Sequence, residues 1–200
     1  MSRSASVLVA VLFLWSATPA TASAQDPEPP PNPRVVIETS MGDITVELFR
    51  ADSPVSVVNF LTYVIDGYYD GTIFHRVIRD LIIQGGGFNE DHTPRLEGLR
   101  GGILNEAPNR VQNRRGTIAM ARLPSPNSGR AQFFINIGHN SIFNHRDPTP
   151  EGYGYAVFGE VVEGMDVVDD ISRVRTTRVQ GMDDFPRDNV VIHRIRRLEQ

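Results

Sequence analysis

Apolar and polar residues alternate in several short stretches of the chain, as is typical of β-strands with one buried face. The first two stretches, 35–39 and 44–48, flank the turn sequence Ser40-Met41-Gly42-Asp43 and predict a β-hairpin. Further strands are predicted over 74–78, 81–84, 116–121, 132–137, 155–162 and 190–195. Residues 89–115 are polar and rich in Gly and Arg, so a long loop is expected there.

Two segments carry the helical spacing instead. The first begins at Ser53, expected to be the N-cap, with Pro54 in the first turn, and ends at Gly67. Its apolar residues are Val57, Phe60, Leu61, Val64 and Ile65. A shorter helix is predicted over 165–171. Many short strands with two helices favour an antiparallel barrel capped by helices.

The first 24 residues have the features of a signal peptide. Arg3 precedes an apolar run over 7–15 that is too short to span a bilayer, and small residues follow. Cleavage is predicted before Gln25, with a second candidate site after Ala22; an uncleaved anchor is the less favoured alternative. We therefore expect a periplasmic protein without stable membrane insertion. Residues 25–33 are rich in proline and predict an extended spacer, so the globular domain should cover 34–200.

Composition excludes several functions. The net charge of −4 gives no basic footprint for nucleic acid. The absence of cysteine rules out disulfides and thiol catalysis and agrees with export. The five histidines have no compact ligand spacing, so neither a metal nor a cofactor is expected. The glycines at 85–87 lack the spacing of a phosphate loop and indicate close backbone packing instead.

A few polar residues stand inside the apolar strands. Arg76, Gln84 and Gln132 could face the amide of a ligand, although a solvated surface arginine is the simpler interpretation of Arg76 taken alone. Phe134 should share the face of Gln132, whereas Phe133 should point to the other side, and His75 should lie opposite Arg76 as a hydrogen-bonded structural residue. A fixed cation, amides and an apolar wall without an obvious nucleophile suit twisting a peptide bond better than cutting one.

The sequence resembles the cyclophilin family of peptidyl-prolyl cis-trans isomerases, in particular its exported bacterial branch. The resemblance runs from about residue 35 to residue 195 and is carried by FHRVI (74–78), IQGG (83–86), GTIAMAR (116–122), QFFIN (132–136) and YAVFGEVVEGMDVVDDI (155–171). It implies a mainly β fold, a closed eight-stranded antiparallel β-barrel capped by two α-helices. It also implies catalysis of rotation about X-Pro bonds without any cofactor.

The resemblance also implies roles for single residues. Arg76 matches the catalytic arginine and Gln84 its partner. The groove for the substrate backbone before the proline matches Ala121, Arg122 and Gln132. The proline pocket matches Leu81, Ile82, Phe134, Phe143 and Tyr155. Ile142 stands where many eukaryotic members have the tryptophan that binds cyclosporin, and Tyr155 stands where they have a histidine, so weak cyclosporin binding is expected.

Some departures leave a second function open. Leu81-Ile82 replaces the common Phe-Met pair, and Arg79-Asp80 replaces the preceding Pro-Gly. The first hypothesis is a monomeric isomerase that acts on proline-containing peptides and unfolded exported proteins. The alternative is a proline-peptide binding or chaperone module with weak catalysis.

Overall fold

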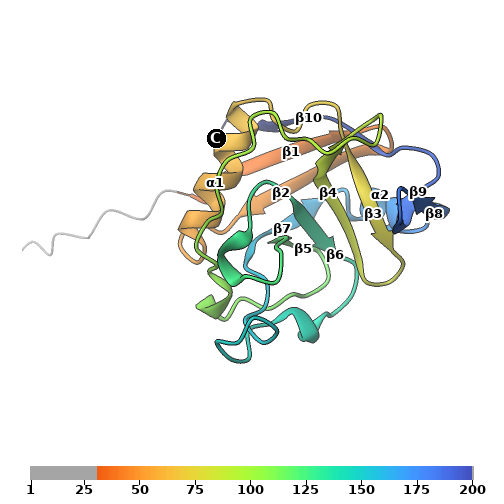
Figure 1. The fold of residues 1–200 in the computed structure, drawn as a ribbon. Helices are drawn as coiled ribbons and strands as arrows, with labels where there is room; N and C mark the ends of the chain where they lie inside the picture. The colour runs from red at the N-terminus through yellow and green to blue at the C-terminus, as the bar shows by residue number, and fades with distance from the viewer. Residues whose placement is uncertain (1–30, 200) are drawn as a thin grey trace, which may run out of the picture. The chain divides into compact units, whose positions relative to one another are not determined.

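A closed antiparallel barrel forms the body of the protein. The computed structural model describes residues 31–199. Its strands follow one another around the barrel in the order β1-β10-β3-β4-β6-β5-β7-β2 (Figure 1). They are β1 (Arg34–Thr39), β2 (Gly42–Leu48), β3 (Thr72–Ile78), β4 (Ile82–Asn89), β5 (Thr117–Met120), β6 (Phe133–Asn136), β7 (Val157–Glu163) and β10 (Val191–Arg197). The predicted eight-stranded barrel is thus confirmed; β4 extends beyond its predicted end, into the segment expected to be a loop.

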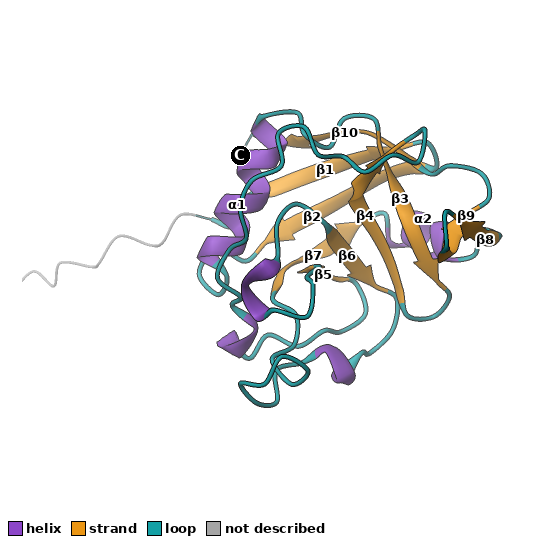
Figure 2. Ribbon diagram, in the orientation of Figure 1, coloured by secondary structure: helices purple, strands orange, loops and turns teal. Residues whose placement is uncertain are grey.

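Two helices lie at opposite ends of the barrel (Figure 2). They are α1 (Pro54–Ile65) and α2 (Met165–Ser172), close to the predicted bounds. Helix α1 buries Val57 and Phe60 in the interior cluster, and α2 buries Val168 and Ile171 there. Each helix therefore closes one end of the barrel with its apolar face.

The start of α1 is capped from a distant loop. Ser53 precedes the helix as predicted, but its hydroxyl donates to the Val157 carbonyl at 2.6 Å and does not cap. The Glu106 carboxylate instead accepts from the backbone N–H groups of Val55 and Ser56, at 2.9 and 2.8 Å. A carboxylate at this end satisfies free N–H groups and interacts favourably with the helix dipole.

The strands separate two apolar clusters on the two faces of the barrel wall. Ile83 and Phe133 belong to the interior cluster, whereas their neighbours Ile82 and Phe134 belong to a smaller cluster on the outer face. This alternation is the ordinary consequence of the two-residue repeat of a strand. The prediction that the two adjacent phenylalanines point to opposite faces is confirmed.

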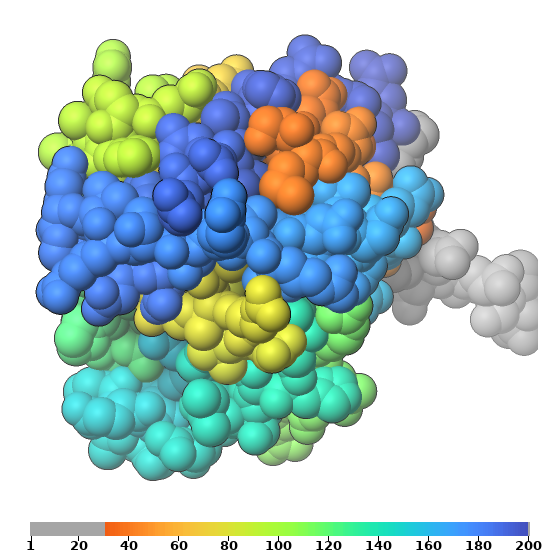
Figure 3. Space-filling model, turned by 90° about the vertical axis from the view of Figure 1, so that its right-hand side faces the viewer, coloured from red at the N-terminus to blue at the C-terminus, as the bar shows by residue number. Residues whose placement is uncertain are grey.

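A small hairpin was missed by the sequence analysis. It consists of β8 (Thr176–Val179) and β9 (Met182–Pro186), which pair outside the barrel sheet. Gln180 and Gly181 form its turn with φ values of 50° and 85°, both positive as a type I′ turn requires. Strand β8 is mostly polar and β9 has two adjacent aspartates, so no apolar alternation marked them. In Figure 3 the hairpin and α2 (blue) lie above the turn between β3 and β4 (yellow).

The predicted signal peptide and residues 25–30 of the predicted spacer lie outside the described residues. The Pro33 carbonyl already accepts a hydrogen bond from the Leu48 N–H at 2.8 Å, so backbone contacts with the barrel begin just before β1. Among residues 31–199, no helix has the length and apolar character needed to cross a membrane.

Candidate functional site

One row of directly paired residues crosses the outer face of the barrel. Arg76 on β3 pairs with Gln84 on β4, and Gln84 pairs with Phe134 on β6. The row continues from Phe134 to Ala119 on β5 and then to Val157 on β7. Directly opposed residues have Cβ atoms about 4.5–5.5 Å apart. The sheet therefore places the cation, the amide and the apolar surface side by side.

A β-bulge aims Arg76 at this face. Phe74 and Arg76 are two residues apart and would share a face in a regular strand. The pairing, however, steps from Phe74–Gly85 to Arg76–Gln84, so that His75 is the extra residue of a bulge. Phe74 is therefore buried in the interior while Arg76 is exposed.

The same bulge corrects the prediction for His75. The imidazole lines the same hollow as Arg76 and does not lie on the opposite face of the strand. It is only 5% exposed, its ring centroid lies 4.7 Å from that of Phe88, and its Nδ1 has no hydrogen-bond partner within residues 31–199. Burial lowers its pKa to about 4, so the ring is neutral at physiological pH.

Among residues 31–199, the Arg76 guanidinium forms a single ion pair, and that pair is long. Its Nε lies 3.9 Å from Oδ2 of Asp184 on β9, and the two side chains are 46% and 40% exposed. An ion pair this long and this solvated is weak. Asp184 has a positive φ of 64°, a conformation that is uncommon outside glycine but that aspartate adopts more readily than most residues. No sequence pattern indicated Asp184, because it belongs to the unpredicted hairpin.

Two glutamine amides lie beside the arginine. Nε2 of Gln84 donates to Oε1 of Gln132 at 2.8 Å, which leaves the second Gln84 N–H for a ligand. Gly87 lies against this pair, and a Cβ at position 87 would overlap the Gln132 side chain. A Cβ at Gly86 would come within 2.8 Å of the Tyr69 ring. The predicted close packing at the three glycines is therefore confirmed.

Three aromatic rings form the apolar surface next to Gln84. The ring centroids of Phe134, Phe143 and Tyr155 lie 5.2–5.6 Å apart, all edge to face. Leu81 and Ile82 pack against the same outer cluster. Phe134 and Ile82 are buried, whereas Leu81, Phe143 and Tyr155 are half-buried and keep part of their surface open to a ligand. The five predicted pocket residues are thus brought together.

A groove continues from the amide pair. Its volume is about 320 Å³, and its lining includes Gln84, Ala121, Arg122 and Gln132. Ala121 is fixed there by the N–H that it donates to the Gln132 carbonyl at 3.0 Å. The structure therefore brings the predicted groove residues together, and extended peptide could lie along them.

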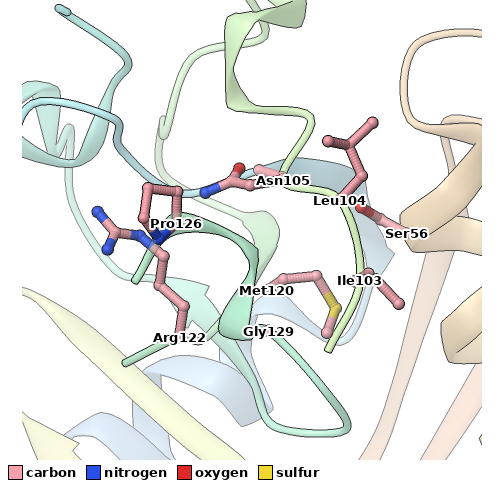
Figure 4. Close-up of a pocket in the computed structure, with 9 residues that line it drawn as sticks. Ser56, Ile103, Leu104, Asn105, Met120, Arg122, Pro126 and Gly129 are labelled. Atoms are coloured by element: carbon pink, nitrogen blue, oxygen red, sulfur yellow. The ribbon is translucent and has the colours of Figure 1, made fainter. Parts of the chain in front are cut away.

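The Arg122 side chain, however, is occupied by its own chain. Its guanidinium donates to the carbonyls of Gly154, Leu123, Pro124 and Pro150 at 2.7–3.0 Å. Figure 4 shows it extending to Pro126, beside a hollow of only about 10 Å³. Nearly all its N–H groups are therefore used within the chain, and the match of Arg122 to the substrate groove stays a prediction.

Ile142 directly precedes Phe143 of the aromatic surface in the chain. It belongs to the short 3-10 helix Ser141–Phe143 and is 65% exposed. An aliphatic side chain in this place offers no ring for stacking, and weak cyclosporin binding stays a prediction. Within residues 31–199, no group of three or more His, Cys, Asp or Glu side chains lies close enough together to hold a metal ion.

Comparison with known proteins agrees with this geometry. The family described as cyclophilin type peptidyl-prolyl cis-trans isomerase/CLD matches residues 34–197. The peptidyl-prolyl cis-trans isomerase cyp18 of Streptomyces antibioticus is 51% identical over 158 residues, which cover 79% of this chain and 94% of that protein. Peptidyl-prolyl cis-trans isomerase B of Escherichia coli K12 is 45% identical over 80% of this chain and 97% of its own length.

A solved structure of the same type is also similar. The cyclophilin type peptidyl-prolyl cis-trans isomerase of Cryptosporidium parvum superimposes with a TM-score of 0.68 at 27% identity, covering 84% of this chain and 99% of that one. A second crystal structure of that protein, determined in the presence of the dipeptide Ala-Pro, matches with the same TM-score at 26% identity.

Proposed function

Because this chain belongs to the family of cyclophilin-type peptidyl-prolyl cis-trans isomerases, we propose that Arg76 is the residue that lowers the barrier to rotation. The chain's activity is the cis-trans isomerisation of peptide bonds before proline. The observation that carries the proposal is the row Arg76–Gln84–Phe134, which places a cation, an amide and an apolar ring on three adjacent strands.

The barrier to be lowered arises from resonance. The nitrogen lone pair is delocalised into the carbonyl, and rotation costs about 18–20 kcal/mol. In the twisted state that lone pair is localised on the proline nitrogen. A guanidinium is permanently charged and can donate to this nitrogen, which is a poor acceptor in either planar form. Arg76 therefore binds the twisted state better than the cis or trans state, as catalysis requires.

The other residues hold the substrate on either side of the rotating bond. The proline ring lies on the surface of Phe134, Phe143 and Tyr155, which is apolar and partly open. The peptide before the proline follows the groove beside Ala121, and Gln84 donates its remaining N–H to a backbone carbonyl. One end is anchored while the other turns, and no covalent intermediate forms.

The Arg76→Ala variant tests the proposal. Exchange spectroscopy on a short X-Pro peptide measures the cis-trans rate directly. Loss of one electrostatic donor to a transition state costs about 10²–10³ in rate, so a decrease of that order is expected. Arg197→Ala, which removes an exposed strand arginine from β10, is the matched control and should leave the rate unchanged. Equal rates for Arg76→Ala and the wild type would contradict the proposal.

We also propose that the chain acts on exported proteins in the periplasm. The support is the amino-terminal sequence, with Arg3, the apolar run 7–15 and the small residues before Gln25. Expression in a bacterium with a periplasm, followed by fractionation and mass spectrometry, should give a periplasmic product that begins at Gln25. That product would lack Trp15, the single tryptophan, and hence tryptophan fluorescence. A cytoplasmic product that retains residue 15 would contradict export.

A further inference from the structure

Three buried asparagines lie behind the aromatic surface of the site. Asn113 is 2% exposed, Asn136 is 0% exposed and Asn140 is 6% exposed. Asn113 belongs to the loop before β5, whereas Asn136 ends β6 and Asn140 follows it in the next loop. Burial of a side-chain amide is unfavourable unless its hydrogen bonds are made, so the partners of these groups are informative.

The three side chains bond to one another in a single direction. Nδ2 of Asn140 donates to Oδ1 of Asn136 at 2.7 Å, and Nδ2 of Asn136 donates to Oδ1 of Asn113 at 3.1 Å. Asn136 also donates to the Thr117 hydroxyl at 2.9 Å, which ties the group to β5. We refer to Asn113, Asn136 and Asn140 as the amide chain.

Both ends of the amide chain terminate on walls of the aromatic pocket. At one end Asn140 donates to the Leu81 carbonyl at 2.9 Å. At the other end Asn113 donates to the carbonyls of Phe143 and Tyr155, at 3.1 and 3.3 Å. Leu81, Phe143 and Tyr155 come from three separate segments, and none of them lies in a strand of the barrel. Their backbones therefore need some other support than the sheet.

We infer that the amide chain positions the walls of the proline pocket, and that Asn113, Asn136 and Asn140 are positioning residues for substrate binding. The inference rests on the proposed function, which assigns the aromatic surface to the proline ring. Groups that bind a substrate must be held within about 0.5 Å of their productive geometry, commonly by buried hydrogen bonds from behind. One continuous chain of amides provides this for three segments together.

The test measures binding of an X-Pro peptide by Asn140→Ala and Asn113→Ala. Asn140 is the more accessible of the two, so its variant is the better choice should Asn113→Ala fail to fold. The expected dissociation constant is about five- to tenfold weaker, since misplaced walls lose contacts with the ring. The rate at saturating peptide should change much less, because Arg76 is untouched. This split between binding and turnover is not expected from a loss of stability alone.

Thr72→Val is the matched control for stability. Its hydroxyl is completely buried on β3 and donates to the Tyr69 carbonyl at 2.7 Å, but neither residue belongs to the pocket. The variant loses a buried hydrogen bond of the same kind and should be destabilised. Its affinity for the peptide should equal that of the wild type.

Phe143→Ala separates the inference from the function on which it rests. If this variant binds the peptide as tightly as the wild type, the pocket assignment itself fails. If it binds weakly while Asn140→Ala and Thr72→Val both retain full affinity, the pocket stands and the amide chain is overturned as a positioning device. In support of the inference, the double variant Asn140→Ala/Phe143→Ala should lose less affinity than the sum of the two single losses.

Discussion

At the scale of single residues, the site depends on two contacts, the glutamine pair beside Gly87 and the ion pair of Arg76 with Asp184. The amide pair Gln84–Gln132 keeps its geometry only because position 87 has no side chain. The charge of Arg76 is opposed by the half-exposed carboxylate of Asp184, 3.9 Å away.

The Gly87→Ala variant should lose activity. The new methyl group would overlap the Gln132 side chain and displace it from Gln84. A displaced positioning group lowers kcat/KM by about tenfold, measured by exchange spectroscopy on an X-Pro peptide. Gly101→Ala is the control, because a Cβ at position 101 meets no atom within 4 Å. Equal activity of the two variants would show that the amide pair does not matter for catalysis.

Neutralising Asp184 should raise activity slightly, in contrast to the loss expected for Gly87→Ala. In Asp184→Asn the guanidinium of Arg76 no longer faces a carboxylate, so its potential at the substrate rises. Because the pair is solvated, kcat/KM should increase by no more than about threefold at low ionic strength and by less in high salt. Asp183→Asn is the control, since Asp183 pairs with Arg178 at 3.5 Å and not with Arg76. A large loss in Asp184→Asn would instead indicate that the carboxylate orients the arginine.

At the scale of elements, a bulge, a hairpin and a helix cap determine which side chains come into contact. The bulge at His75 turns Arg76 to the outer face, and the hairpin β8–β9 brings Asp184 beside it. Helix α1 depends on Glu106, which lies about fifty residues further along the chain. The long connection before β5 is therefore part of the support of the helix and not only a linker.

The Glu106→Ala variant should weaken the start of α1. Three hydrogen bonds end on its carboxylate, from the N–H groups of Val55 and Ser56 and from the Ser56 hydroxyl. Loss of a helix cap costs about 0.5–2 kcal/mol in the free energy of unfolding, measured by urea denaturation. Glu97→Ala, an exposed glutamate in the same connection, should change stability by less than about 0.5 kcal/mol. If both variants unfold at the same urea concentration, the cap contributes nothing.

At the scale of the whole molecule, the barrel buries a titratable group within the wall that carries the site. Burial lowers the pKa of His75 from its ordinary value of 6.5 to about 4, so the folded state favours the neutral ring. As the pH falls below 6.5, the unfolded chain takes up a proton that the folded chain does not. Stability is then lost progressively down to about pH 4, by up to about 3 kcal/mol from this residue.

The His75→Gln variant tests this pH dependence. Between about pH 7 and pH 5 the free energy of unfolding of the wild type should decrease, whereas that of the variant should decrease distinctly less. Carboxylates paired with arginine, such as Glu47 and Asp169, have lowered pKa values and lose their contribution only at more acidic pH. Parallel pH profiles for the two proteins in this window would exclude a buried neutral imidazole as the cause.

Most of the fold, and the types of group in the site, could be predicted from local patterns. The two-residue alternation identified the barrel strands and assigned Phe133 and Phe134 to opposite faces, because a strand repeats its direction every second residue. The motifs also indicated the residues of the row Arg76–Gln84–Phe134. These features are local, so the order of residues along the chain suffices to predict them.

The support of those groups, in contrast, comes from contacts that form in the folded barrel. The cap from Glu106, the bonds from Arg122 to the carbonyls of Gly154 and Pro150, and the amide chain join segments far apart in sequence that the closed barrel brings together. The bulge at His75 depends on how β3 pairs with β4. Polar side chains in loops follow no periodic pattern, since each is placed by its partner and not by its neighbours in sequence. Closure of the barrel is therefore what converts a set of recognisable residues into an ordered site.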